Sequence, residues 1–255
     1  FNNYNRLFAG NRNLGNALSE SFRLNYFSYN LFNYTNINGS LSYTKRTKGI
    51  KNNTTLVAIN QVTQPENFDP DNPDHIYAAS GRFSKRISKI EYRLNATLSY
   101  SELFSRVNEA LQQSESFTQN YRLSARSSFS EWPNFEVGYN WTRNQYNNGR
   151  VDQLFFTQRP YFSLDVNFLK SFYWTVNWDF YDYSNQENTI RNNYSFLNST
   201  LYYQEQDSHW EFSLQGTNLT NNQATNTDSF TEQFNSTSQY IVLPRIIMFV
   251  VKYDL

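Results

Sequence analysis

The sequence contains no cysteine, which excludes disulfide bonds, thiolate metal sites and cysteine catalysis. It has only two histidines, and no stretch approaches the roughly 18 consecutive apolar residues of a membrane-spanning helix. Its 22 basic and 22 acidic residues leave a formal net charge of +0. A nucleic-acid-binding domain needs a basic excess, so we expect no nucleic-acid partner.

Aromatic residues are abundant although hydrophobic residues as a whole are scarce. The hydrophobic fraction is 38%, below the ~45–50% of ordinary globular domains, yet aromatics make up 18%, with 20 Tyr and 22 Phe. Disordered chains lack aromatics, so this chain folds. Tyr and Phe mixed with Asn, Ser and Thr suit strands that have one apolar face and one wet face.

Apolar and polar residues alternate along most of the chain. In 92–100, Tyr, Leu and Ala take the even positions, while Arg, Asn, Thr and Ser take the odd ones. This period of two indicates β-strands. It predicts one all-β domain over 1–255, a transmembrane antiparallel β-barrel with about 11 strands in this chain. The predicted strands are 19–30, 36–43, 77–87, 92–100, 117–130, 135–142, 162–168, 172–180, 197–203, 210–217 and 243–255.

The final stretch, LPRIIMFVVKYDL, alternates in the same way. One of its faces is apolar with an aromatic ring near the end, and this face includes Phe249, Val251, Tyr253 and Leu255. An outer-membrane barrel closes its sheet with such a strand, so these residues are the predicted membrane-insertion signal. A half-buried edge strand of a soluble protein is the alternative interpretation.

The connections between the predicted strands alternate between short and long, an asymmetry typical of outer-membrane barrels. Short turns are predicted near 31–33, 88–90, 132–134, 169–171 and 207–209. Long loops are predicted near 49–76, 106–116, 143–152, 184–190 and 221–238, the second with room for a helical turn. Aromatics cluster at the short-turn ends, which indicates an interfacial girdle that includes Trp132, Phe172, Tyr173 and Trp210.

Charged residues recur on the polar side of the predicted strands, where a barrel has its lumen. The lumen-facing candidates are Arg23, Arg93, Arg122, Arg126, Glu136, Asp165, Asp179 and Glu211, together with Arg82 and Arg86. Basic residues dominate the earlier strands and acidic residues the later ones. Such a lumen could orient a plug or a solute by its electric field. The alternative, which we favour, is that these charges pair with each other.

The histidines do not predict a catalytic site. His75 falls in a predicted long loop and His209 in a short turn, so we expect them on opposite sides of the sheet. Ser208 and Asp207 lie beside His209, but adjacent residues rarely have the geometry of a catalytic triad. We therefore expect no enzyme activity.

Acidic residues in the longest predicted loop suggest one metal candidate. Asp69, Asp71 and Asp74 could ligate calcium, although their spacing differs from that of the EF-hand loop. A solvated loop is the favoured interpretation. We expect no metal and no cofactor.

An odd number of strands leaves the first and last strands running in the same direction. Such strands cannot pair antiparallel, and bacterial single-chain barrels have even strand numbers. Either one further strand lacks a visible pattern or the chain forms part of a larger barrel, and we favour the larger barrel. The sequence also shows no signal peptide, which we interpret as a mature or truncated piece of a longer chain.

Two stretches resemble a known family. GNRNLGNALSESFRLNYFSYNLFNYTNINGSLSYTK is similar to the middle of TonB-dependent-receptor-type outer-membrane barrels, in the branch whose chains begin with a carboxypeptidase-regulatory-like domain and a plug. WEFSLQGTNLTNN, with Asn218, Leu219 and Asn221, is similar to their last two strands. The resemblance implies a barrel of about 22 strands, with this chain as its C-terminal half. The chain departs from the family in ending on Leu255 instead of an aromatic residue, and it contains no plug or TonB box.

The patterns and the resemblance together imply a barrel in the outer membrane of a Gram-negative bacterium that imports a solute. One alternative is a structural or assembly component that holds surface lipoprotein or secretion partners. A soluble β-sandwich binding module is another. The expected partners are outer-membrane lipid and the barrel-assembly machinery. Further candidates are TonB, through an N-terminal part that this chain lacks, and surface lipoprotein or other outer-membrane proteins.

Overall fold

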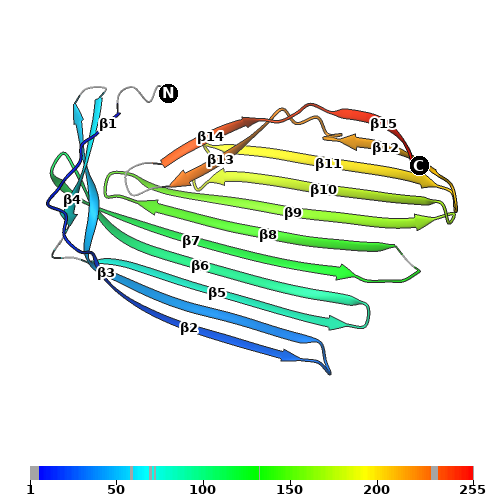
Figure 1. Cartoon of the computed structure of the whole chain (residues 1–255), viewed down its shortest axis with the longest axis horizontal. Helices are drawn as coiled ribbons and strands as arrows, with labels where there is room; N and C mark the ends of the chain where they lie inside the picture. Colours follow the sequence, from blue (N-terminus) through cyan, green and yellow to red (C-terminus); the bar gives the residue numbers. More distant parts are fainter. Residues whose placement is uncertain are drawn as a thin grey trace.

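One large, mostly antiparallel β-sheet dominates the protein (Figure 1). The computed structural model describes residues 6–57, 60–68, 71, 73–131, 133–230 and 235–254. Over these ranges the chain forms strands, turns and irregular segments. None of the residues in these ranges belongs to a helix long and apolar enough to cross a membrane.

Eleven strands follow one another side by side across the described sheet, and we refer to them as the wall strands. In spatial order they are β2 (Leu18–Asn30), β3 (Thr35–Val57), β5 (Asp74–Ile87), β6 (Ile90–Val107), β7 (Ala110–Ser127), β8 (Asn134–Asn147), β9 (Asp152–Phe168), β10 (Phe172–Asn185), β11 (Arg191–Gln204), β12 (Trp210–Thr217) and β15 (Ile246–Tyr253). Each pairs antiparallel with its neighbour, so the predicted all-β antiparallel fold is confirmed.

Four shorter strands lie outside this series. The C-terminal part of β3 pairs with β4 (Asn60–Phe68), and β1 (Arg6–Phe8) pairs parallel with β4. This hairpin rises from one end of the sheet in Figure 1. A separate hairpin joins β13 (Ala224–Phe230) to β14 (Asn235–Ile241). We call the end of the wall strands beside the β3–β4 hairpin the hairpin end, and the opposite end the turn end.

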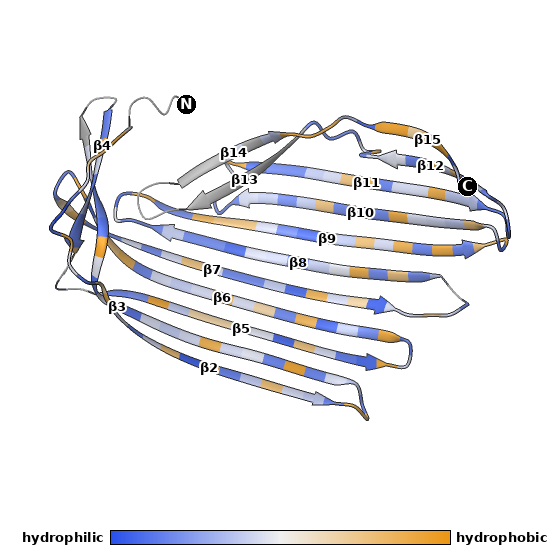
Figure 2. Ribbon diagram, in the orientation of Figure 1, coloured by the Kyte–Doolittle hydropathy of each residue, from blue (hydrophilic) through white to orange (hydrophobic). Residues whose placement is uncertain are grey.

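The register sorts the side chains of the wall strands onto two faces. Leu94 lies opposite Phe83 and Leu123, whereas the next residue, Asn95, lies opposite Arg82 and Arg122. Because successive side chains of a strand point to opposite faces, the first row defines an apolar face and the second a polar face. Figure 2 shows the resulting alternation of hydrophobic and hydrophilic residues along the strands.

The structure corrects several predicted loops. Residues 49–76 are not one irregular stretch, because β3 continues to Val57 and pairs with β4. Residues 106–116 form the tip of the β6–β7 hairpin and hold no helical turn. The predicted loop 221–238 contains β13 and the start of β14. These segments are polar on both faces, so no apolar alternation marks them, yet pairing in a hairpin satisfies their backbone hydrogen bonds.

A small buried core lies at the hairpin end, where the C-terminal part of β3 pairs with β4 and also with the end of β6. Phe68 and Phe104 are each 4% exposed. The Lys51 ammonium lies 2.8 Å from the Asp74 carboxylate and 4.9 Å from the centre of the Phe68 ring. The backbone N–H of Phe104 donates to Asp74 over 2.9 Å, and Lys51 also donates to the Phe104 carbonyl. These contacts fix the hairpin to the sheet.

The same contacts correct the candidate calcium site. Asp74 is 2% exposed and is the partner of Lys51, so its carboxylate already has a cation. Asp71 is exposed in the loop before it, and Asp69 lies outside the described residues. Within the described residues, the Asp74 carboxylate is therefore already paired and is not free to act as a calcium ligand.

The tip of the β6–β7 hairpin yields a test of the backbone geometry. Asn108 and Glu109 form its turn with φ values of 50° and 66°. A residue with a Cβ loses about 1–2 kcal/mol in this left-handed region, whereas glycine adopts it freely. We expect Glu109→Gly to raise the free energy of unfolding by about 1 kcal/mol, measured by denaturant titration in detergent. Glu115→Gly, inside β7, is the control and should lower it; equal effects of both substitutions would contradict this turn.

Candidate functional site

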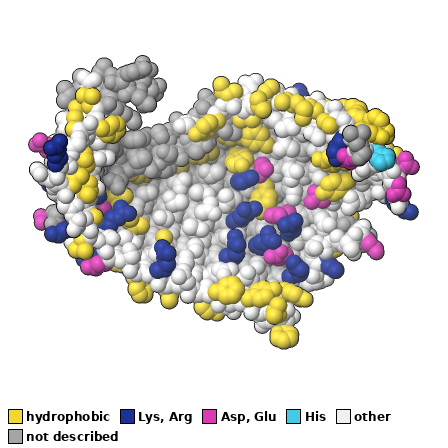
Figure 3. Space-filling model, viewed as in Figure 1, with side chains coloured by type: hydrophobic (Ala, Val, Ile, Leu, Met, Phe, Trp, Pro, Cys, Tyr) yellow, Lys and Arg dark blue, Asp and Glu magenta, His cyan; other side chains and the backbone are white. Residues whose placement is uncertain are grey.

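The polar face carries the charged residues that the sequence singled out. The register places all eight lumen-facing candidates on this face: Arg23, Arg93, Arg122, Arg126, Glu136, Asp165, Asp179 and Glu211. Charged side chains gather in the middle of the face shown in Figure 3, and hydrophobic ones lie along its rim. Arg93, Arg122, Arg126 and Glu136 lie on neighbouring strands, whereas Arg23 on β2 and Glu211 on β12 lie far apart near opposite margins.

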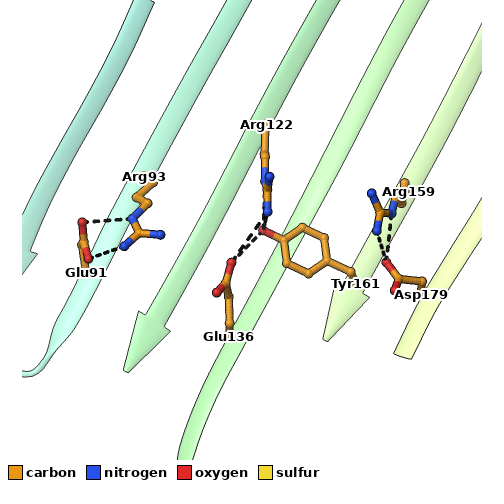
Figure 4. Close-up of polar contacts among 7 residues, drawn as sticks. All are labelled: Glu91, Arg93, Arg122, Glu136, Arg159, Tyr161 and Asp179. Carbon is orange, nitrogen blue, oxygen red and sulfur yellow. Dashed lines mark hydrogen bonds and ion pairs between the residues drawn. The ribbon is translucent and has the colours of Figure 1, made fainter. Parts of the chain in front are cut away.

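A hydrogen-bonded chain on the polar face joins β7, β8 and β9 (Figure 4). Arg122 donates to the Tyr161 hydroxyl from Nη2 over 2.9 Å and from Nε over 3.1 Å. That hydroxyl donates to Glu136 Oε1 over 3.1 Å, and Arg122 Nη2 lies 3.8 Å from the same oxygen. The Tyr161 hydroxyl thus bridges a cation and a carboxylate that come from neighbouring strands.

Glycine at position 138 makes room for this bridge. Gly138 lies directly opposite Tyr161 in the β8–β9 register. A Cβ on Gly138 would overlap the outer end of the Tyr161 ring, so the ring lies flat over the backbone of β8. An aromatic ring that covers a strand glycine also shields the exposed backbone and helps to fix the register.

Two further carboxylates of the polar face form close pairs with arginines. Glu91 accepts two hydrogen bonds from Arg93, at 3.0 and 2.7 Å. Asp179 lies 2.9 Å from Nε and 2.6 Å from Nη2 of Arg159. Each pair neutralises one acidic side chain on the face.

The remaining acidic candidates also have partners. Asp165 accepts a hydrogen bond from the Tyr173 hydroxyl over 3.2 Å. The Glu211 carboxylate lies 3.8 Å from the ammonium of Lys252, which is on the edge strand β15. Each acidic candidate on the polar face therefore lies beside an arginine or lysine or accepts a hydrogen bond from a tyrosine.

The sequence reasoning missed Arg159, Tyr161 and Glu91 as members of this network. Its predicted strands began at 92 and 162, which left these residues in turns or loops. Proline at position 160 hides the start of β9 because it donates no ladder hydrogen bond. In the alternation of RPYFSLD, Arg159 and Tyr161 share a face with Asp165, and this signal could have found them.

The apolar face holds the described part of the predicted insertion signal. Phe249, Val251 and Tyr253 lie opposite Leu214, Phe212 and Trp210. The rings of Trp210 and Tyr253 are 4.7 Å apart. Leu255 lies outside the described residues.

Aromatic rings line the apolar face at both ends of the wall. Towards the hairpin end, neighbouring strands place in one row Tyr43, Tyr77, Tyr100 and Phe117. Their ring centres are 4.8 to 6.3 Å apart. Towards the turn end, a second row holds Phe168, Phe172, Tyr203 and Phe212. Of the predicted girdle, Tyr173 lies on the polar face, which corrects that prediction, and Trp132 lies outside the described residues.

The histidines do not join the charged network. The Tyr43 hydroxyl lies 2.9 Å from His75 Nδ1 at the hairpin end. His209 lies at the turn end, with its ring centre 5.8 Å from that of Tyr253. Across the described ranges, no three His, Asp or Glu side chains are grouped to hold a metal ion.

No protein-family model matches the sequence, and no curated protein matches it.

The Gly138–Tyr161 contact yields a test of the network. Gly138→Ala should displace the Tyr161 ring, break the Arg122–Tyr161–Glu136 chain and lower the free energy of unfolding by about 1–3 kcal/mol. Gly81→Ala is the matched control, since a Cβ at Gly81 meets nothing within 4 Å. Denaturant titration in detergent measures both variants. Adding Tyr161→Ala to Gly138→Ala should remove the clash, so the two losses should not add; additive losses would contradict this contact.

Proposed function

We propose that the wall strands form part of a β-barrel in the outer membrane of a Gram-negative bacterium, with the apolar face towards lipid and the polar face towards the lumen. The observation that carries this proposal is the sorting of apolar and polar residues onto two faces by the register of the wall strands. An exposed apolar face with aromatic rows at both ends is what a lipid-facing barrel surface requires. On it, Phe22 is 66% and Phe249 67% exposed to solvent, which is costly in water.

The dimensions of the apolar band support the proposal. In β6 the band extends over the nine residues from Tyr92 to Tyr100. At ~3.3 Å per residue these cover about 26 Å along the strand, or about 20 Å along the barrel axis for a tilt of ~40°. This is close to the apolar band of ~25 Å on outer-membrane barrels.

The strand directions support a larger barrel. Both β2 and β15 run towards the turn end, and within the described sheet each has one paired neighbour, β3 and β12. Two strands that run in the same direction cannot close an antiparallel barrel by pairing with each other. Closure needs an odd number of further strands between them, in agreement with the larger barrel that the family resemblance implies.

Solute import is the function that we propose for this barrel. The resemblance of 10–45 and 210–222 to TonB-dependent-receptor-type barrels supports it, as does a polar face rich in Arg, Asn, Ser and Tyr. The second candidate is a structural or assembly component. The β3–β4 hairpin favours that candidate, because the pair between Lys51 of the hairpin and Asp74 of β5 holds it firmly to the sheet beyond the apolar band.

Two adjacent residues of β6 test the membrane assignment. Leu94→Arg places a charge in the apolar band and should lower the free energy of unfolding in bilayers by about 2–4 kcal/mol. Asn95→Arg is the matched control on the polar face and should have little effect. The measurement is the amount of folded protein in the outer-membrane fraction. Equal yields of the two variants would exclude a lipid-facing position for Leu94.

Experiments on the native full-length protein can distinguish a role in solute import from a role in assembly. A transporter should support uptake of its solute that stops when the energy coupling through TonB is removed. An assembly component should instead retain stoichiometric protein partners in detergent and show no uptake. Mass spectrometry of the purified complex and an uptake assay in a deletion strain measure the two outcomes.

A further inference from the structure

Five arginines gather on the polar face of β5, β6 and β7, and we call them the arginine patch. Arg82 and Arg86 lie on β5, Arg93 on β6, and Arg122 and Arg126 on β7. In register, Arg82 faces Asn95, which faces Arg122, and Arg86 faces Glu91, which faces Arg126. Two cations on β5 and two on β7 therefore mark the corners of a rectangle, with Arg93 between them.

Most of the positive charge in the patch is not neutralised by the described residues. Among these residues, Arg82, Arg86 and Arg126 have no carboxylate oxygen within 4 Å. Arg82 donates to the Asn95 amide oxygen over 2.8 Å, and the Arg86 guanidinium lies 5.9 Å from the centre of the Tyr34 ring. Glu91 is occupied by Arg93, and Glu136 shares Arg122 with Tyr161 at the margin. Arg82, Arg86, Arg122 and Arg126 are all exposed.

The patch borders a hollow in the polar face. Arg86, Arg93 and Arg126 line this hollow near the turn end, together with Lys89 from the β5–β6 turn and the carboxylates of Glu91, Glu131, Glu136 and Asp165. Exposed guanidinium groups bind carboxylates through paired, charge-assisted hydrogen bonds. The hollow is accessible, and its cations Arg86, Lys89 and Arg126 have no carboxylate oxygen within 4 Å among the described residues.

The spacing of the corners selects an extended ligand. Neighbouring strands are ~4.8 Å apart, so β5 and β7 are about 10 Å apart. Four residues along a strand cover about 13 Å. A single phosphate or sulfate is too small to reach two corners. A polypeptide in extended conformation has the same rise per residue as the strands, so side chains four residues apart match Arg82 and Arg86.

We propose that the arginine patch binds an acidic peptide in extended conformation, with carboxylates four residues apart, and that such a peptide is the solute of the barrel. This proposal rests on the proposed function, because the polar face must be the lumen. Carboxylates of the peptide contact Arg82 and Arg86 on one side and Arg122 and Arg126 on the other. The side chain of Ser84, which faces Arg93 in register, supplies a hydroxyl between them.

Binding of a hexaglutamate peptide to the full-length protein in detergent tests the proposal by titration calorimetry. We expect saturable binding that weakens as salt increases, and no binding of hexaglutamine. The double substitution Arg82→Gln with Arg126→Gln should weaken binding about tenfold, which corresponds to two exposed ion pairs of up to about 1 kcal/mol each. Arg143→Gln with Arg191→Gln removes the same charge from the apolar side and should leave binding unchanged.

Three results would overturn the proposal. They are no binding of hexaglutamate, equal binding by the two double variants, and displacement of the peptide by inorganic phosphate or a uronic-acid oligosaccharide at a lower concentration than by the peptide itself. Each is measured on purified protein and does not depend on membrane location. Failure of the patch is therefore distinct from failure of the barrel assignment, which the Leu94→Arg and Asn95→Arg variants measure separately.

Discussion

The strict alternation of side chains between two faces, kept in register across neighbouring strands, is the constraint on which the rest of this structure depends. A slip of one residue would exchange every side chain of a strand between the faces. It would place Arg93 among Phe and Leu and move Leu94 among Arg and Asn. Eleven wall strands satisfy this constraint in the described chain, although few of their side chains are buried. Backbone pairing and the environment of each face therefore hold the sheet, and a conventional core contributes only at the hairpin end.

The polar face combines two kinds of charge with different consequences. On β8 to β10 the carboxylates have partners, and the Tyr161 hydroxyl links Arg122 to Glu136 over a glycine that leaves space for its ring. Such pairs hold neighbouring strands in place. On β5 and β7, Arg82, Arg86 and Arg126 project from the sheet with no carboxylate within 4 Å among the described residues. The expectation that the charges pair with each other therefore describes the acidic strands and fails for these arginines, where a ligand has room to bind.

The sequence predicts the central parts of the wall strands well and their ends poorly. Between Tyr92 and Tyr100 one face of the strand is apolar and the other is polar, so apolar and polar residues alternate clearly in the sequence. In 49–68 both faces are polar, so β4 leaves no apolar trace although its backbone is paired. Pro160 lies inside β9, where proline is disfavoured, so it conceals the strand around Arg159 and Tyr161 in the sequence. The lumen-facing candidates follow from strand parity alone, whereas the bridging role of Tyr161 depends on the neighbouring Gly138, which only the register brings opposite it.

The absence of cysteine from this chain makes the most direct measurement possible. Single cysteines at successive positions from Leu94 to Leu98 of β6 would each carry a fluorophore, with the protein reconstituted in bilayers. Quenching by brominated lipid and by iodide in the water then reports the environment of each position. The account predicts lipid quenching at Leu94, Ala96 and Leu98 and aqueous quenching at Asn95 and Thr97. Quenching of all five positions by iodide alone, without alternation, would contradict a lipid-facing apolar side.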